Sequence, residues 1–153
     1  MLWHHTLNVV SYNINENLYH IQNNETSSIS LWRENSSLFR VIEFDRFLSL
    51  LTGSDYTLIE RRFLPIFDEL LANEIEIKPV KIYRKLTGET WDSYAELIIK
   101  EHIIVDKNEI RFNQECNVWQ YKHHLFLSES MGTRINKMSK GSLILINGFA
   151  RFG

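Results

Sequence analysis

The sequence predicts an α+β fold in which two to three helices pack on one face of a mostly antiparallel sheet. Strand-like alternation in the first third is followed by helical periodicity in the middle and then by further strands, an order typical of this class. Six glycines and two prolines in 153 residues are few for an all-β fold with many tight turns. The length predicts one domain, 1–153, with a frayed C-terminal tail from about residue 148.

The first third is predicted as four strands, because apolar and β-branched residues alternate with polar ones. Asparagine-rich breaks at 13–15 and 23–25 have the composition of turns. The end of the fourth segment also fits a helical face, so we place a strand only as far as Phe44. The predicted strands cover residues 7–12, 18–21, 29–32 and 38–44.

A short helix is expected over 45–51, with Asp45 as its N-cap and Gly53 just beyond its end. The strongest helical pattern follows over 56–73. Pro65 would either kink this helix or begin a second one. Apolar residues recur in it at spacings of three and four, and we expect it to bury Tyr56, Ile59, Phe63, Ile66, Phe67, Leu70 and Leu71.

The second half is predicted as one more helix, a polar loop over 131–140 and further strands. The helix would begin at Thr90 and bury Trp91, Tyr94, Ala95 and Ile98. Because proline has no backbone N–H, we expect the strand that contains Pro79 to lie at a sheet edge or to form a bulge there. The predicted strands cover 75–83, 103–105, 109–112, 119–127 and 143–146, of which the last suits burial on both faces.

The chain carries no motif for a cofactor, a metal ion or a catalytic centre, and we expect neither cofactor nor metal. Its six glycines are scattered and form no G-x-G-x-x-G or Walker-type loop. The six histidines and one cysteine include no His-x-x-x-His or Cys-x-x-Cys spacing. A metal site would need neighbouring strands to bring together His4 or His5, His20, and His123 or His124.

A small enzyme is one alternative, with Cys116 as nucleophile and His123 or His124 as its base. A hairpin between Cys116 and His123 could bring the two side chains together. The other interpretation is that Cys116 is a small buried hydrophobe, because no family signature surrounds it.

Charge is divided unequally along the chain. Residues 1–77 carry five Lys and Arg against eleven Asp and Glu, while residues 78–153 carry twelve against eight. The basic half allows a second alternative, a nucleic-acid-binding module in which basic residues are interleaved with aromatic ones. An ordinary solvated face explains the same pattern, so nucleic acid is the less expected partner. Ten of the twelve would form the candidate nucleic-acid surface: Lys78, Lys81, Arg84, Lys85, Lys107, Arg111, Lys122, Arg134, Lys137 and Lys140.

The acidic half contains four carboxylates at or just past the C-terminal end of the helix predicted over 56–73, and a fifth, Glu60, higher on that helix. We call them the acidic strip: Glu60, Asp68, Glu69, Glu74 and Glu76. The helix dipole disfavours each anion at that end by about 0.3–1 kcal/mol. Locally unfavourable chemistry of this kind is more frequent at functional sites. The alternative is neutralisation inside the fold by Lys78, Lys81 or Arg84.

These features predict a protein-binding inhibitor, most simply an immunity protein or antitoxin that covers the active site of a basic toxin such as a nuclease. Aromatic side chains would anchor the contact. The N-terminus lacks a signal-peptide pattern, and no segment is long enough to form a transmembrane helix. The single cysteine permits no internal disulfide. We therefore expect a cytoplasmic protein without a membrane partner, and its oligomeric state is open.

Overall fold

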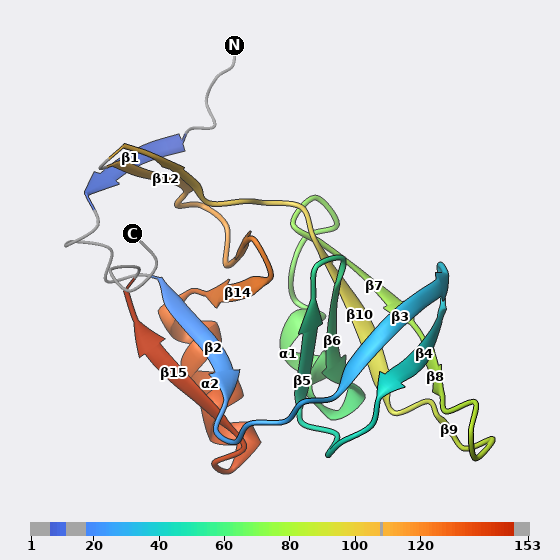
Figure 1. Ribbon diagram of the computed structural model, residues 1–153. Helices are drawn as coiled ribbons and strands as arrows, with labels where there is room; N and C mark the ends of the chain where they lie inside the picture. The colour runs from blue at the N-terminus through green and yellow to red at the C-terminus, as the bar shows by residue number, and fades with distance from the viewer. Residues whose placement is uncertain (1–6, 12–17, 108, 149–153) are drawn as a thin grey trace.

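The computed structural model describes residues 7–11, 18–107 and 109–148 and is built mostly from β-strands (Figure 1). Strands account for 48% and helices for 14% of the structure. The described residues form four small sheets and two short α-helices. The predicted α+β fold, with two to three helices on one face of a sheet, is therefore wrong.

The first sheet lies in the middle of the molecule (Figure 1). In spatial order it contains β5 (Leu50–Gly53), β6 (Tyr56–Glu60), β10 (Tyr94–Ile99) and β7 (Ile75–Pro79). Neighbouring strands are antiparallel, and the two interior strands, β6 and β10, are buried along nearly their whole length. Pro79 lies on β7 at the sheet edge, as predicted, where its missing N–H disrupts no ladder.

The second sheet packs beside the first and contains β3 (Ser30–Asn35), β4 (Leu38–Glu43), β8 (Lys81–Tyr83) and β9 (Thr90–Trp91). β4 and β8 are parallel, whereas every other pairing between described strands is antiparallel. Leu31, Phe39 and Ile82 point inward and form a core cluster with Tyr56, Leu58 and Tyr94 of the first sheet. Side chains thus seal the space between the two sheets.

The third sheet contains β13 (Val118–Tyr121), β14 (His124–Leu127), β2 (Tyr19–Asn23) and β15 (Leu143–Asn147). The helix α2 (Glu129–Ser139) connects β14 to β15 and packs on this sheet. A Cβ built on Gly132 would come within 3.1 Å of the Leu145 side chain, so a larger residue there would require that side chain to shift by a few tenths of an ångström. The fourth sheet, β1 (Leu7–Ser11), β12 (Glu109–Asn113) and β11 (Ile104–Asp106), lies at one end of the molecule (Figure 1).

The largest core cluster joins the first sheet, the third sheet and the helices. The 3-10 turn η1 (Arg61–Phe63) and the helix α1 (Leu64–Phe67) follow β6 directly. Phe63 and Phe67 from these turns pack with apolar residues of α2, β2 and β10. A separate cluster beneath the fourth sheet surrounds Trp119 and Phe112.

The helix predicted over 56–73 is a strand followed by two short helical turns. Residues 56–60 form β6, whose side chains are buried on both faces, and a short apolar run of this kind has no period that distinguishes strand from helix. Pro65 lies in the first turn of α1, where its missing donor is tolerated. Five of the seven side chains expected in the core are buried all the same: Tyr56, Ile59, Phe63, Ile66 and Phe67. Leu70 is only half-buried and Leu71 is exposed.

The helix predicted from Thr90 is also wrong, since this segment forms β9 and β10. Tyr94, Ala95, Leu97 and Ile99 are all buried because β10 is an interior strand with both faces covered. Two buried faces together supply an apolar residue at most positions, so spacings of three and four arise without a helix.

Three further expectations need correction. Residues 44–49 form no helix, and β5 begins at Leu50. The loop predicted over 131–140 is most of α2, whose thin buried stripe consists of Met131, Gly132, Ile135 and Ser139. The strand predicted over 119–127 is the β13–β14 hairpin, with Lys122 at φ +54° in its turn. Of the tail predicted from about residue 148, only Gly148 lies within the described residues.

Candidate functional site

The outer face of the sheet β3-β4-β8-β9 carries aromatic and apolar side chains that the core does not use. Side chains alternate between the two faces of a strand, so Leu31, Phe39 and Ile82 point inward while their neighbours point outward. The strand register places Trp32 opposite Arg40 and Arg40 opposite Tyr83. A row of two aromatic rings and one guanidinium therefore crosses three strands.

Trp32 of this row and three further large hydrophobic side chains, which line one groove, lie exposed on this side of the molecule. We call them the exposed apolar face: Trp32, Ile42, Phe44 and Leu86. They are between 45% and 85% exposed, and they make up four of the seven exposed large hydrophobic side chains among the described residues. Single exposed apolar side chains are ordinary, whereas a contiguous group on one sheet is typical of an interaction surface.

A groove opens at one end of this face. Its walls come from the end of β4 and from the turn after β8, and its volume is about 540 Å³. The residues that line it are Arg40, Val41, Ile42, Phe44, Arg84, Lys85 and Leu86. The guanidinium of Arg84 lies 3.9 Å from the centre of the Phe44 ring, a cation–π contact that holds the ring in place.

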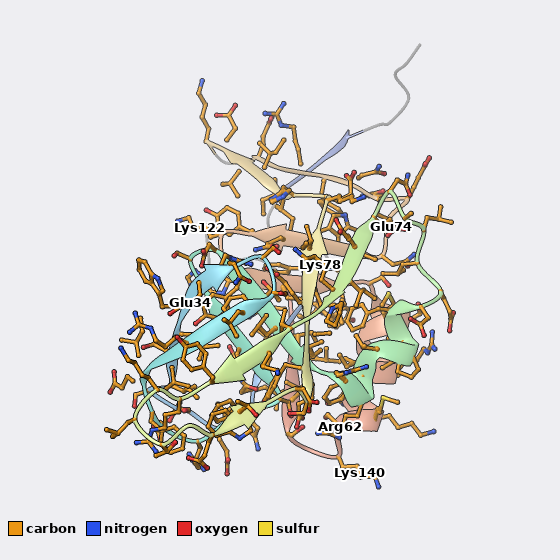
Figure 2. All side chains as sticks on the ribbon, turned by 90° about the vertical axis from the view of Figure 1, so that its right-hand side faces the viewer. Glu34, Arg62, Glu74, Lys78, Lys122 and Lys140 are labelled. Atoms are coloured by element: carbon orange, nitrogen blue, oxygen red, sulfur yellow. The ribbon has the colours of Figure 1, made fainter. Side chains whose placement is uncertain are left out.

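The polar groups on this face are fixed by Glu34. Its carboxylate accepts a hydrogen bond of 2.9 Å from the Tyr83 hydroxyl. The same carboxylate forms an ion pair with Arg40, whose Nε lies 2.9 Å away. The hydrogen bond to Glu34 raises the pKa of Tyr83 above its ordinary value. Figure 2 shows Glu34 on the same side of the molecule as β3 and β4, with α1 on the opposite side. The face is thus ordered by contacts within the sheet.

The structure does not assemble the acidic strip into one surface. Glu74 is only 5% exposed, and its carboxylate accepts a 2.8 Å hydrogen bond from the backbone N–H of Asn117. Glu60 pairs with Arg62, and Glu69 on the α1 side pairs with Arg134 of α2 at 2.6 Å. In Figure 2, Arg62 lies low on the molecule and Glu74 at its upper right. Charge reversal at Glu74 would therefore disturb the fold rather than report on a partner.

The dipole argument for the strip also fails. α1 has four residues and Asp68 is its C-cap, so no long helix concentrates partial negative charge at this end. Asp68 and Glu76 are exposed, on the loop after α1 and on β7 respectively. Two of the five carboxylates of the strip thus lie at the surface outside the ion pairs described above.

Cys116 and His123 lie at opposite ends of the β13–β14 hairpin. The pairing runs from Val118 with Leu127 to Tyr121 with His124, so Cys116 precedes one end and His123 occupies the turn at the other. The paired length alone is about 10 Å. Burial raises the pKa of the Cys116 thiol to about 12, helped by the negative charges of Glu74, Glu101 and Glu115. This environment is the opposite of what a nucleophilic thiolate needs.

We predict that iodoacetamide labels Cys116 very slowly in the folded protein at pH 8, because almost no thiolate is present there. Labelling should accelerate to the rate of an ordinary thiol once denaturant unfolds the chain, as followed by intact mass spectrometry. Rapid alkylation of the folded protein near pH 7, with an inflection in that range, would contradict the raised pKa.

The basic residues of the second half do not form one patch. Lys78 and Lys81 lie on β7 and β8, Arg111 on β12, Lys122 in the β13–β14 turn, and Arg134 on α2. Figure 2 shows Lys122 at the upper left of the molecule and Lys140 at its bottom, far apart. Only Lys81, Arg84 and Lys85 lie on or next to β8, close to Tyr83, as the sequence pattern required.

Other kinds of site are not supported by the part of the chain that the structure describes. Within residues 7–11, 18–107 and 109–148, no three or more His, Cys, Asp and Glu side chains are arranged to hold a metal ion. His20, His123 and His124 do lie close together as rings, while His4 and His5 fall outside the described residues. Neither of the described α-helices could cross a bilayer.

Comparison of the chain with protein-family models, curated proteins and solved structures finds no match. The geometry of the exposed apolar face is therefore the main guide to function. Sequence reasoning missed this face, because Trp32 reaches Ile42 and Phe44 only through the pairing of β3 with β4, and Leu86 only through the parallel pairing of β4 with β8. The one feature in the sequence that pointed to this face was Trp32, an aromatic residue at a strand position where the alternation of apolar and polar residues calls for a polar, outward-facing side chain.

Proposed function

We propose that this protein is a protein-binding inhibitor of the immunity-protein or antitoxin type, which covers the active site of a partner toxin with its exposed apolar face. One observation carries the proposal: Trp32, Ile42, Phe44 and Leu86 are exposed on or just beyond the strands β3, β4 and β8, with basic side chains beside them. Tryptophan, other aromatic residues and arginine are the residue types that dominate binding energy at protein interfaces.

The partner no longer needs to be basic. That expectation depended on the acidic strip, whose members are buried, paired or separated. Asp68 and Glu76 could still steer a cationic partner over a distance. The energetic anchor of the proposed contact, however, is the exposed apolar face, which carries Arg84 and Lys85 at its end.

Co-expression with the protein encoded by the adjacent reading frame tests this function. We expect that protein to arrest growth when expressed alone and this chain to restore growth. Trp32→Ala should remove protection, since truncating a tryptophan anchor costs about 2 kcal/mol of binding or more. Trp32 is largely exposed, so the variant should keep its folding stability within about 0.5 kcal/mol.

Leu71→Ala is the matched control, because Leu71 is equally exposed and apolar but lies in the loop after α1, away from the exposed apolar face. This variant should protect cells as well as the unmodified chain. Equal protection by both variants would show that the exposed apolar face is not the binding surface. If the unmodified chain does not restore growth, the inhibitor function itself is refuted.

A second candidate function is binding of single-stranded nucleic acid, which the row Trp32–Arg40–Tyr83 favours, since aromatic rings between cations can stack bases and contact phosphates. Glu34 opposes it by occupying both Arg40 and the Tyr83 hydroxyl. Salt-dependent binding of a labelled oligodeoxythymidylate, lost in Trp32→Ala, would favour this candidate over the inhibitor.

A further inference from the structure

Part of β4 has a neighbouring strand on only one side. β4 pairs with β3 as far as Glu43, which is opposite Ser30. Its pairing with β8 ends earlier, at Arg40 opposite Tyr83. Beyond Tyr83 the chain turns away, closed by hydrogen bonds from Arg84 N–H to the Glu89 carbonyl and from Gly88 N–H to the Arg84 carbonyl. Among the described strands, none therefore lies beside residues 41–43 on the β8 side.

The groove described above opens at this free edge. Its apolar surface comes from Val41, Ile42, Phe44 and Leu86, and its polar surface from three cations and no carboxylate. Arg40 is already paired with Glu34. Arg84 reaches Glu89 only at 4.0 Å, and Lys85 takes part in no ion pair among the described residues. The groove thus offers a strand edge, an apolar floor and two cations that carboxylates can approach.

We propose that this groove binds an extended segment of the partner protein that carries Asp or Glu next to aliphatic or aromatic side chains. The inference rests on the proposed function and names the chemistry of the segment recognised. An added strand would continue the sheet from β8 alongside residues 41–43, with its backbone pairing to β4. Its side chains would alternate, so that carboxylates reach Arg84 and Lys85 while apolar groups reach Ile42 and Leu86.

Charge complementarity favours this occupant over a second copy of the chain. Two of the five exposed carboxylates on the described strands are already bound by arginines, Glu34 by Arg40 and Asp106 by Arg111. The other three, Glu43, Glu76 and Glu109, lie on three different strands, so a second copy would present them singly. An unpaired acidic segment from a different protein would meet Arg84 and Lys85 without first breaking such pairs.

Selection of short displayed peptides against the full chain tests the proposal. We expect the enriched peptides to share a carboxylate adjacent to an apolar residue. A synthetic enriched peptide should bind the unmodified protein, and the double variant Arg84→Glu with Lys85→Glu should weaken binding by about tenfold or more. Binding should also slow amide hydrogen exchange in residues 41–43, which a purely electrostatic contact would not do.

Lys137→Glu with Lys140→Glu is the matched control, because it reverses the same number of charges on and just after α2, away from the groove. This control should bind the peptide unchanged. Failure to enrich any peptide, or enriched peptides that bind the Arg84/Lys85 variant as tightly as the unmodified protein, would overturn the proposal. Displacement of the peptide by an oligonucleotide would assign the groove to nucleic acid instead and would also overturn it.

The growth assay separates this inference from the proposed function. If the chain rescues growth and the Arg84/Lys85 variant rescues equally well, the inhibitor function stands and the acidic-segment inference fails. If no rescue occurs but acidic peptides bind the groove, the inhibitor function fails and the recognition chemistry stands.

Discussion

Replacing Arg33 by leucine is expected to destabilise the protein by about 3–5 kcal/mol, the cost of leaving one buried charge without its partner. Arg33 Nη1 donates to Glu96 Oε1 at 3.2 Å and Nη2 to Glu96 Oε2, so the pair is bidentate across β3 and β10. The Glu96 side chain is only 5% exposed. The hydrogen bond to Glu96 is also the main reason that the pKa of Arg33 is raised above its ordinary value.

Two further variants test whether the unpaired buried charge of Glu96 causes the loss of stability in Arg33→Leu. Glu96→Leu should cost less than Arg33→Leu, because Arg33 would keep its contacts with Asp55 and with water. The double variant Arg33→Leu with Glu96→Leu should recover much of the loss, since no buried charge remains. Urea denaturation followed by circular dichroism measures all three. Equal losses for both single variants, with no recovery in the double variant, would show that the arginine acts through packing alone.

Phe63→Ala is expected to cost about 3–5 kcal/mol of unfolding free energy, as usual for truncating a fully buried aromatic side chain. Phe63 has no exposed surface and lies in the cluster that joins the first sheet, the third sheet and α2. The guanidinium of Arg62 covers its ring at 4.3 Å. A cavity at this junction would loosen contacts between elements far apart in the chain.

Phe44→Ala is a control with identical chemistry. Phe44 is 45% exposed, so its truncation should cost about 1 kcal/mol or less. Both variants are measured by the same denaturant melts. A loss below about 1 kcal/mol for Phe63→Ala would contradict its place in the core, and similar losses for both variants would contradict the difference in their burial.

The sequence predicted most strands but misassigned the elements that determine fold class. The strands β1, β3, β4 and β12 have sequences in which apolar and polar residues alternate, and they were predicted as strands. β6 and β10 were mistaken for helices because both of their faces are buried, which removes the period of two. Burial of their side chains could be predicted, but the conformation that buries them depends on neighbouring strands distant in sequence.

α2 was missed for the opposite reason. Its buried stripe is narrow and includes a glycine and a serine, so the segment looks polar in sequence. The helix is held by tertiary contact with β15, above all where Gly132 approaches Leu145. Such a helix owes its stability to packing rather than to intrinsic propensity.

The candidate site was predictable only in part. The interleaving of Tyr83 with Lys81, Arg84 and Lys85 is visible in the sequence, and these residues do lie together. Their juxtaposition with Trp32, Ile42 and Phe44 follows from the parallel pairing of β4 with β8 across more than 40 residues of intervening chain, which no local pattern indicates. The prediction that the acidic strip forms a binding surface was wrong, because it depended on the end of a long helix over 56–73 that the structure does not contain.

The central claim is that the exposed apolar face is the binding surface, and the affinity of the proposed partner for the Trp32→Ala and Leu71→Ala variants tests it most directly. Calorimetric titration of the purified partner should show Trp32→Ala binding about 30-fold more weakly, the equivalent of about 2 kcal/mol, with Leu71→Ala unchanged. Both variants should melt like the unmodified protein. Unchanged affinity for Trp32→Ala alongside weaker binding of Leu71→Ala would contradict the account and move the interface to the α1 side of the molecule.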